Sequence, residues 1–228
     1  MFTLEAEMKA PVRRWLSNKG MHVAEELPTG WGICDLVGCR FDPEKVAFRT
    51  ERKQRQPLGS PEAVYIYSQL PDSDRTRTGV RREALVKRLA PYISEDRIDR
   101  ALSRLEATNH IRVTRTGTFQ KVNGWAPMYS RLVAVELKLS RLSEVLQQAR
   151  ANRAFVPESF VALPSDVARR AMKSSFADEL AREGIGLLAV SEKSCRTLLD
   201  AEPTSGWLDD SLELWAVEYF WRSYRGRH

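Results

Sequence analysis

The sequence predicts an α/β protein with a mixed β-sheet, interrupted in the middle of the chain by a small domain of a different kind. Three observations support this prediction. Helical and β-type apolar patterns alternate in residues 1–56 and again in 129–228. Residues 57–128 instead hold three consecutive helical patterns and then two short β-prone runs. The excess positive charge of the chain is concentrated in this middle segment and the stretch before it.

The first helix is expected over residues 4–19, where apolar residues recur at helical spacing and Gly20 follows as a stop. Two β-prone runs, 21–27 and 32–41, come next, and the turn-forming Pro28-Thr29-Gly30 joins them. The chain is therefore expected to begin with a helix followed by a β-hairpin.

The middle segment begins with a polar, basic run at 49–56 and a proline- and glycine-containing stretch at 57–61, a composition typical of a linker. Three amphipathic patterns and two short β-prone runs around Gly117 follow. We expect helices at 62–70, 81–92 and 95–109, the last with Ser94 as its N-cap, and strands at 111–116 and 118–122. Three helices and a hairpin in this order indicate a winged helix-turn-helix, which we assign to residues 57–128.

The α/β alternation resumes after Arg131, with a β-branched, apolar run as its first element. We expect strands at 132–139, 159–163 and 187–191, and helices at 142–154, 166–182 (with Asp166 as its N-cap) and 208–224. Residues 1–56 and 129–228 would thus form one discontinuous domain around the insertion.

Composition excludes several classes of protein. At 228 residues, with 43% hydrophobic and 29% charged residues, the chain can build one large core or two small ones. Three cysteines, an odd number, and the lack of a secretory pattern favour a reducing cytoplasm. The three histidines have no partners at zinc-ligand spacing, and the apolar stretches are too short to span a bilayer, so neither a zinc site nor a membrane anchor is expected.

Positive charge is localised rather than spread over the chain. Residues 49–121 contain sixteen basic and nine acidic residues, a net charge of +7, whereas the remainder has a net charge of −1. Arg97, Arg100 and Arg104 share one face of the third expected helix, which in a helix-turn-helix enters the major groove of DNA.

Further basic residues of the insertion could contact adjacent phosphates. Those of the hairpin are Arg112, Arg115 and Lys121, and those near the second helix are Arg75, Arg77, Arg81 and Arg82. We therefore expect a nucleic acid, DNA or RNA, as the partner, with duplex DNA preferred. The alternatives are a solvated basic face and a protein-binding module.

Three charged residues stand out because they interrupt apolar strands. Glu136 and Lys138 lie two apart in the run Val135-Glu136-Leu137-Lys138, so both side chains are expected on one face. Asp35 is a lone acid in the second strand. The carboxylates converge if these strands are neighbours, whereas a surface ion pair on an edge strand is the simpler alternative.

These residues resemble the PD-(D/E)XK, or restriction-endonuclease-like, nucleases. That family has an αβββαβ core, with an Asp on the second strand and a Glu-x-Lys on the third. Asp35 would match the Asp and Glu136-Leu137-Lys138 the Glu-x-Lys. The two motifs are 101 residues apart, and removing the insertion leaves an ordinary hairpin connection.

The resemblance implies a metal-dependent endonuclease that hydrolyses DNA and leaves a 5′-phosphate. Asp35, Glu136 and the Leu137 carbonyl would bind Mg²⁺ or Mn²⁺, a hard cation that takes oxygen ligands. Lys138 would position or activate the attacking water, or stabilise charge on the phosphate.

The resemblance also implies an acid on the first helix and a glutamine on the helix after the Glu-x-Lys. Glu5 borders the expected buried face and is preferred as the acid, with Glu7 and Glu26 as alternatives. Gln148 is the better glutamine match, and Asn152 occupies the place where some members have a tyrosine.

The last expected helix, at 208–224, is apolar on two faces. One face is expected to cover the sheet. The other could mediate docking of the insertion or a homodimer, or be buried within a single molecule. Two further functions remain open: a catalytically inactive nuclease fold that binds DNA or serves as a scaffold, and a transcriptional regulator.

Overall fold

The computed structural model describes residues 2–29, 32–73, 76, 78–122, 128–204 and 208–224. The chain divides into two compact units. The sheet unit comprises Met1–Phe41 and Tyr129–Glu213, and the helical unit comprises Asp42–Met128 and Leu214–His228. Among the described residues, no helix is long and apolar enough to cross a membrane.

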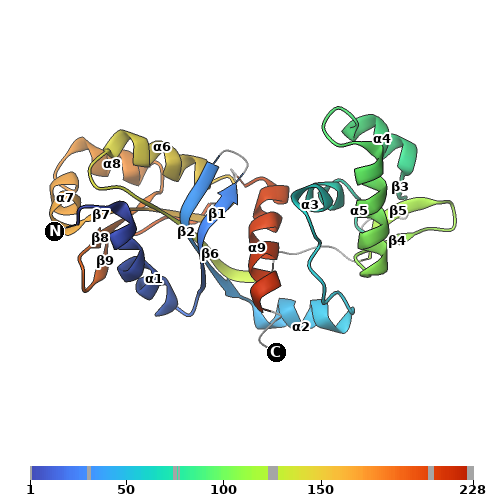
Figure 1. Ribbon diagram of the computed structural model, residues 1–228, viewed down its shortest axis with the longest axis horizontal. Coiled ribbons are helices and arrows are strands. Elements are labelled where there is room, and N and C mark those ends of the chain that lie inside the picture. Colours follow the sequence, from blue (N-terminus) through green and yellow to red (C-terminus); the bar gives the residue numbers. More distant parts are fainter. Residues whose placement is uncertain are drawn as a thin grey trace. The chain divides into compact units, whose positions relative to one another are not determined.

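The sheet unit is built on a mixed sheet, for which six strands are described in the order β1-β2-β6-β7-β8-β9 (Figure 1). Its β1, β2 and β6 pair antiparallel, β6, β7 and β8 pair parallel, and β9 returns antiparallel to β8. The strands are β1 (His22–Thr29), β2 (Gly32–Phe41), β6 (Tyr129–Leu137), β7 (Glu158–Pro164), β8 (Gly186–Val190) and β9 (Cys195–Leu199). The α/β class with a mixed sheet is thus confirmed.

Two layers of helices bury the two faces of this sheet, which explains why β7 and β8 are buried along their whole length. On one face, Leu16 of the first helix packs with Leu36 and Val135. On the other, Ala149 packs with Val161. The helices are η1 (Glu5–Met8, a 3₁₀ turn), α1 (Lys9–Ser17), α6 (Leu142–Asn152), α7 (Ser165–Ala171) and α8 (Ser175–Arg182).

Gly38 permits the close approach of α1 to β2. A Cβ at this position would lie 2.8 Å from Met21 Sδ and 2.9 Å from Leu16 Cδ2. Contacts this short require the neighbours to move, so a larger residue at position 38 would push the helix away from the strand.

The helical unit surrounds a separate core, in which Leu58, from the segment before the helix that begins at Pro61, is buried together with residues of several helices, including Leu85, Leu105 and Leu214. A small sheet with the strand order β3-β5-β4 accompanies the helices (Figure 1). The elements are α2 (Pro43–Glu51), α3 (Pro61–Ser68), β3 (Val80–Arg81), α4 (Arg82–Leu89), α5 (Glu95–Ala107), β4 (Ile111–Val113), β5 (Thr118–Lys121) and α9 (Asp210–Tyr224), of which α9 belongs to this unit from Leu214 onward.

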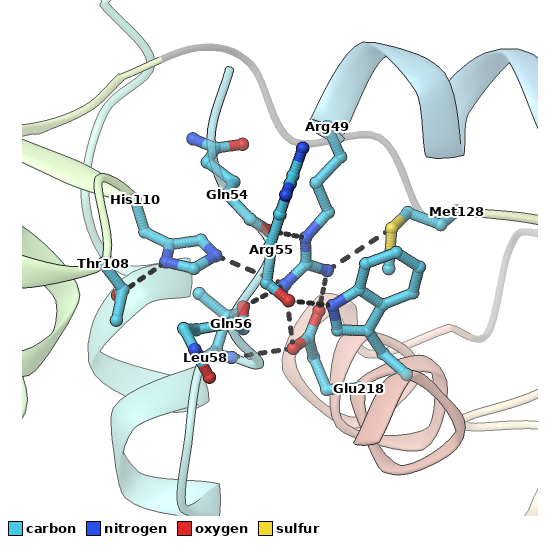
Figure 2. A network of polar contacts seen from close by, with 10 residues as sticks. Arg49, Gln54, Arg55, Gln56, Leu58, Thr108, His110, Met128 and Glu218 are labelled. Atoms are coloured by element: carbon cyan, nitrogen blue, oxygen red, sulfur yellow. Dashed lines mark hydrogen bonds and ion pairs between the residues drawn. The ribbon is translucent and has the colours of Figure 1, made fainter. Parts of the chain in front are cut away.

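A buried ion pair between Arg49 of α2 and Glu218 of α9 holds the helical unit together (Figure 2). The second Glu218 oxygen, Oε2, accepts a hydrogen bond from the Leu58 amide at 2.7 Å. Arg49 Nε donates to the Gln54 carbonyl at 2.7 Å. The guanidinium therefore joins α2, the chain that follows it and α9.

His110 completes this network as a neutral side chain. Its Nε2 lies 3.3 Å from Arg49 Nη2, and its Nδ1 lies 2.8 Å from Thr108 Oγ1 (Figure 2). Burial, with the positive charge of Arg49, lowers the pKa of His110 to about 3. Nε2 thus accepts from the arginine while Nδ1–H faces the threonine hydroxyl.

The predicted linker at 49–56 begins inside a helix. Asp42 caps α2 by accepting hydrogen bonds from the Glu44 and Lys45 amides, and Pro43 occupies the first turn. Basic character at Arg49 therefore reflects a buried ion pair and not a solvated linker.

Further elements differ from the sequence expectations. The helix predicted at 166–182 is two helices, because Ser174 caps the start of α8. Asp166 lies inside α7, so its assignment as an N-cap was wrong. Ser94 does occupy the N-cap of α5, although its side chain makes no capping hydrogen bond. The short strands β3 and β9 were not predicted; alternate residues of β9 are exposed, which gives it a weak apolar signal.

The unit boundaries also differ from those predicted. Residues 42–56 and 214–228 fall in the helical unit, whereas the sequence assigned both to the discontinuous α/β domain. The ion pair between Arg49 and Glu218 and the packing of Leu214 in the helical core account for this difference. One apolar face of α9 is buried within a single chain, with Leu214, Val217 and Trp221, whereas Leu212, Trp215 and Tyr219 on the other face are half-buried.

Replacing Glu218 by glutamine should strongly destabilise the helical unit, because a buried guanidinium would lose its counter-charge. We expect the free energy of unfolding to fall by about 3 kcal/mol, measured by urea denaturation. Asp99→Asn, which breaks the exposed pair with Arg82, is the matched control and should lower the free energy of unfolding far less, because exposed ion pairs contribute little. Equal losses in the two variants would contradict the importance of the buried pair.

Candidate functional site

The pairing of β2 with β6 brings Asp35 and Glu136 together. Leu36 is opposite Val135 in the antiparallel register. Asp35, which precedes Leu36, therefore faces Glu136, which follows Val135. Asp35 Oδ2 accepts a hydrogen bond from the Leu137 amide at 2.8 Å. The Asp35 carboxylate is also within hydrogen-bonding reach of the Glu136 carboxylate. The convergence expected from the sequence is therefore present in the structure.

Glu136 is a buried acid, only 3% exposed. Its Oε1 accepts a hydrogen bond from Asn152 Nδ2 at 2.7 Å. Burial raises the pKa of Glu136 to about 7, and the negative charge of Asp35 adds to this shift, while the Asn152 hydrogen bond opposes it. Near neutral pH this carboxyl group is therefore close to its midpoint and readily gains or loses a proton.

Cys34 and Asn152 adjoin the acidic pair, and neither was assigned a role from the sequence. Asn152 Nδ2 lies 3.5 Å from Cys34 Sγ as well as contacting Glu136. Burial raises the pKa of the Cys34 thiol, and the Glu136 charge raises it further, so the thiol stays protonated. A polar Asn152 within the buried stripe of α6 was the available sequence signal.

Lys138 follows directly after the end of β6 and connects two helices. Its Nζ lies 3.2 Å from Glu5 Oε2 and 3.2 Å from Glu144 Oε1. Burial acts to lower the pKa of Lys138, but hydrogen bonds to Glu144 and Glu5 outweigh it and the pKa is raised. The ammonium group is therefore charged and held in place at the end of the strand that carries Glu136.

The three acids considered for the first helix or strand have different partners. Glu5 contacts Lys138. Glu7 instead accepts hydrogen bonds from the Thr3 and Leu4 amides, which lower its pKa. Of the three, Glu5 is thus the acid that the structure joins to the Glu-x-Lys segment.

Glu26 forms an ion pair with Lys9, with Nζ and Oε1 2.7 Å apart. Its hydrogen bond to Lys9 lowers the pKa of Glu26, and the side chain is 65% exposed. The Asp35 charge also contributes to the raised pKa of Lys9, so this pair lies within electrostatic range of the acidic pair.

Gln148 has an amide oxygen available for a ligand. It lies one turn before Asn152 on α6, and so on the same side of the helix. Its Oε1 is buried, and it has no hydrogen-bond partner among the described residues. A buried acceptor without a donor is costly, which is typical of groups that bind water or a ligand.

The site offers oxygen ligands of the kind that magnesium uses. The described residues contain no group of three or more His, Cys, Asp or Glu side chains that could hold a metal ion by themselves. Magnesium, however, is commonly held by one or two carboxylates and retains several waters. Asp35, Glu136 and the carbonyl of Leu137 fit that requirement, and a cation would relieve the repulsion between the two carboxylates.

The predicted nucleic-acid-binding arginines of α5 are exposed and partly engaged. Arg97 forms an ion pair with Glu62 of α3. Arg100 Nε donates to the Asp96 carbonyl of its own helix at 3.1 Å. Arg104 is exposed as well. The structure therefore places all three side chains on the surface of the helical unit.

The basic residues of the hairpin differ in their exposure and in their partners. Arg112 Nη2 donates to Gln120 Oε1 at 3.2 Å, and Arg115 is exposed. Lys121 was expected to reach a phosphate, but its side chain is only 14% exposed and its Nζ lies 3.4 Å from Asp72 Oδ1. That ion pair and its burial make Lys121 a structural residue in this conformation.

The four arginines expected near the second helix of the insertion also differ in exposure and partners. Arg81 is exposed. Arg82 is paired with Asp99 through two hydrogen bonds of 2.7 and 2.6 Å. Arg75 and Arg77 lie outside the described residues.

Comparisons with known proteins give no family. No family model matches the sequence, and no curated protein matches it. Among solved structures, the chain is similar to one described as "SPO1766 protein of unknown function from Silicibacter pomeroyi". The likeness has 18% sequence identity and a TM-score of 0.30, and it covers 57% of this chain and 84% of that one. At this level the likeness carries no argument about function.

The raised pKa of Glu136 predicts a stability effect that depends on pH. An acid whose pKa is higher in the folded than in the unfolded chain loses stability as pH rises between the two values, from 4.5 to about 7. Glu136→Gln, measured in EDTA, should therefore gain stability relative to wild type between pH 5 and pH 8, by about 2–3 kcal/mol. Asp178→Asn, an exposed acid of the same unit, should show no such trend. A constant difference across pH would contradict the assigned environment.

Proposed function

We propose that this protein is a metal-dependent endonuclease that hydrolyses phosphodiester bonds in DNA. The observation that supports this most is the convergence of Asp35 and Glu136. They come from strands separated by the whole insertion, and Lys138 follows Glu136 by two residues. Two carboxylates held together, with Glu136 buried, are costly to maintain unless they are used.

In the proposed reaction, Asp35, Glu136 and the Leu137 carbonyl would hold Mg²⁺ or Mn²⁺. The bound cation would neutralise charge on the phosphate and lower the pKa of a water molecule. Glu136 must give up its proton to act as a ligand, which its pKa near 7 allows at physiological pH.

Lys138 and Glu5 serve different purposes in this proposal. The Lys138 ammonium stabilises negative charge that develops on the phosphate, or orients the attacking water. Glu5 is a positioning residue, because its carboxylate lies 3.2 Å from Lys138 Nζ. Gln148 supplies a buried amide oxygen that can accept a hydrogen bond from a water molecule.

The same proposal assigns a specific fold family to each of the two units. In the mixed sheet, helix α6 connects the parallel strands β6 and β7. This arrangement is consistent with a restriction-endonuclease-like core. Helices α3, α4 and α5 with the sheet β3-β5-β4 are consistent with a winged helix-turn-helix. The helical unit would then bind duplex DNA through exposed arginines, of which Arg97, Arg100 and Arg104 are the main group.

A second function, a catalytically inactive DNA-binding or scaffold protein on the same fold, is favoured by one observation. Lys138 is already engaged by two carboxylates, those of Glu5 and Glu144. An ammonium group held in this way would have to leave one of them to act on a phosphate. In that case the acidic pair would bind a metal ion without hydrolysis.

Incubation of supercoiled and linear duplex DNA with the full chain and Mg²⁺ or Mn²⁺ tests the proposal. Wild type should cleave, whereas Asp35→Asn and Lys138→Gln should lose at least about a hundredfold in rate, the usual effect of removing a charge-stabilising group. Asp178→Asn, the exposed control acid, should cleave like wild type. Cleavage that persists in both site variants would show that a different site or a contaminant is responsible, and metal binding without cleavage by wild type would favour the inactive alternative.

A further inference from the structure

A cavity of about 430 Å³ opens on the surface of the helical unit, between the start of α3 and the exposed face of α5. Its lining is strongly basic: Ser60, Glu62, Ala63, Arg97, Arg100, Ala101 and Arg104. We propose that this cavity, the arginine cleft, binds phosphate groups of the nucleic-acid backbone. The identity of the molecule that carries the phosphate rests on the proposed function, whereas the phosphate chemistry rests on the cleft itself.

The charges of the cleft favour an anion. Arg97, Arg100 and Arg104 are spaced by three and four residues, so their guanidinium groups lie on one side of α5. Glu62 is the one acid in the lining, and its ion pair with Arg97 leaves a net charge of +2. Guanidinium groups bind phosphate oxygens with paired N–H donors, and two unbalanced ones match two backbone phosphates or one terminal phosphate.

The Arg104 side chain lies against the chain that enters α3. Gly59 has a φ of +123°, and a Cβ on it would lie 2.9 Å from Arg104 Nε. Arg222 of α9 donates a hydrogen bond to the Gly59 carbonyl and stacks on Trp215, with 4.9 Å from its Cζ to the ring centroid. The backbone that leads into the cleft is therefore anchored to α9 next to Arg104, and a preorganised backbone lowers the entropic cost of binding.

The arginines, and not the helix terminus, supply the attraction. Ser60 Oγ already accepts a hydrogen bond from the Ala63 amide at 3.3 Å. The Glu62 carboxylate is also held at the first turn, where hydrogen bonds to Ser60 and to its own amide lower its pKa. Donors at the start of α3 are thus partly occupied, whereas Arg100 contacts only a backbone carbonyl in the described contacts.

This placement changes the expected role of the α5 arginines. A side chain drawn into a cleft toward α3 is suited to hold a phosphate, whereas a base-reading side chain must extend into the groove. The cleft should therefore contribute affinity that is independent of base sequence and depends strongly on salt.

Fluorescence anisotropy with a labelled DNA duplex in EDTA tests the proposal, because cleavage cannot occur there. The full-length triple variant Arg97→Gln, Arg100→Gln, Arg104→Gln should bind about tenfold or more weakly than wild type, and its log K against log salt slope should be shallower by about 2. Arg100→Gln alone, which disturbs no tertiary ion pair, should show part of the loss. Arg88→Gln, an exposed arginine of α4, is the control and should bind within about twofold of wild type.

Removing the competing acid gives a second, opposite prediction. Glu62→Gln should tighten binding more than Glu106→Gln, which makes the same change in net charge at an exposed position of α5. Duplexes with and without a 5′-phosphate distinguish the phosphate source, because a terminal group predicts tighter binding of the phosphorylated duplex and backbone phosphates predict equal binding.

The outcomes separate this inference from the nuclease proposal. Weaker binding of Arg100→Gln and of the triple variant supports the cleft, even if wild type fails to cleave DNA with magnesium. If Arg100→Gln and the triple variant bind like the Arg88→Gln control, or if Glu62→Gln weakens binding, the cleft is not a phosphate site, whatever the cleavage assay shows.

Discussion

The antiparallel pairing of β2 with β6 is the constraint on which the rest of the molecule depends. It joins segments that are about a hundred residues apart in the chain, with Leu36 opposite Val135 and Phe41 opposite Tyr129. Because β2 ends beside the start of β6, the intervening residues 42–128 must leave and rejoin the sheet unit at neighbouring points, and the Asp42 amide indeed donates to the Met128 carbonyl at 2.9 Å. A slip of one residue in this register would move every side chain to the other face and separate the acidic pair.

The same pairing creates an electrostatic conflict. Asp35 and Glu136 are forced together in a place where Glu136 is nearly inaccessible to water, and Asn152 compensates only in part. A proton on Glu136 resolves the conflict at low pH, and a divalent cation would resolve it at higher pH. The helical unit contains the contrasting case: the Arg49 guanidinium and the Glu218 carboxylate neutralise each other, and hydrogen bonds satisfy the remaining donors and acceptors. That pair needs no ligand, and so we interpret it as structural.

The sequence was sufficient for the elements whose apolar period is unambiguous. The first helix, the hairpin of β1 and β2, and the alternation of β6, α6 and β7 were predicted within a few residues. The position of Asp35 beside Glu136 was also predicted, because a lone acid in an apolar strand is a strong signal. Long-range polar contacts could not be predicted, because nothing local indicates that Arg49 pairs with Glu218. Helix α2 was therefore not predicted, its end was included in a linker, and one face of α9 was expected to cover the sheet. The ion pair of Lys121 was not predicted for the same reason, since its partner Asp72 is distant in sequence.

Calorimetric titration of the metal-free chain with Mn²⁺ at pH 6.5, in two buffers of different ionisation enthalpy, tests the central claim most directly. If Asp35 and Glu136 form one metal site, a single Mn²⁺ should bind, and the heat should depend on the buffer because Glu136 releases a proton on binding. Asp35→Asn should abolish this binding, whereas Asp178→Asn should not. Binding that releases no proton, or that survives in Asp35→Asn, would contradict the account.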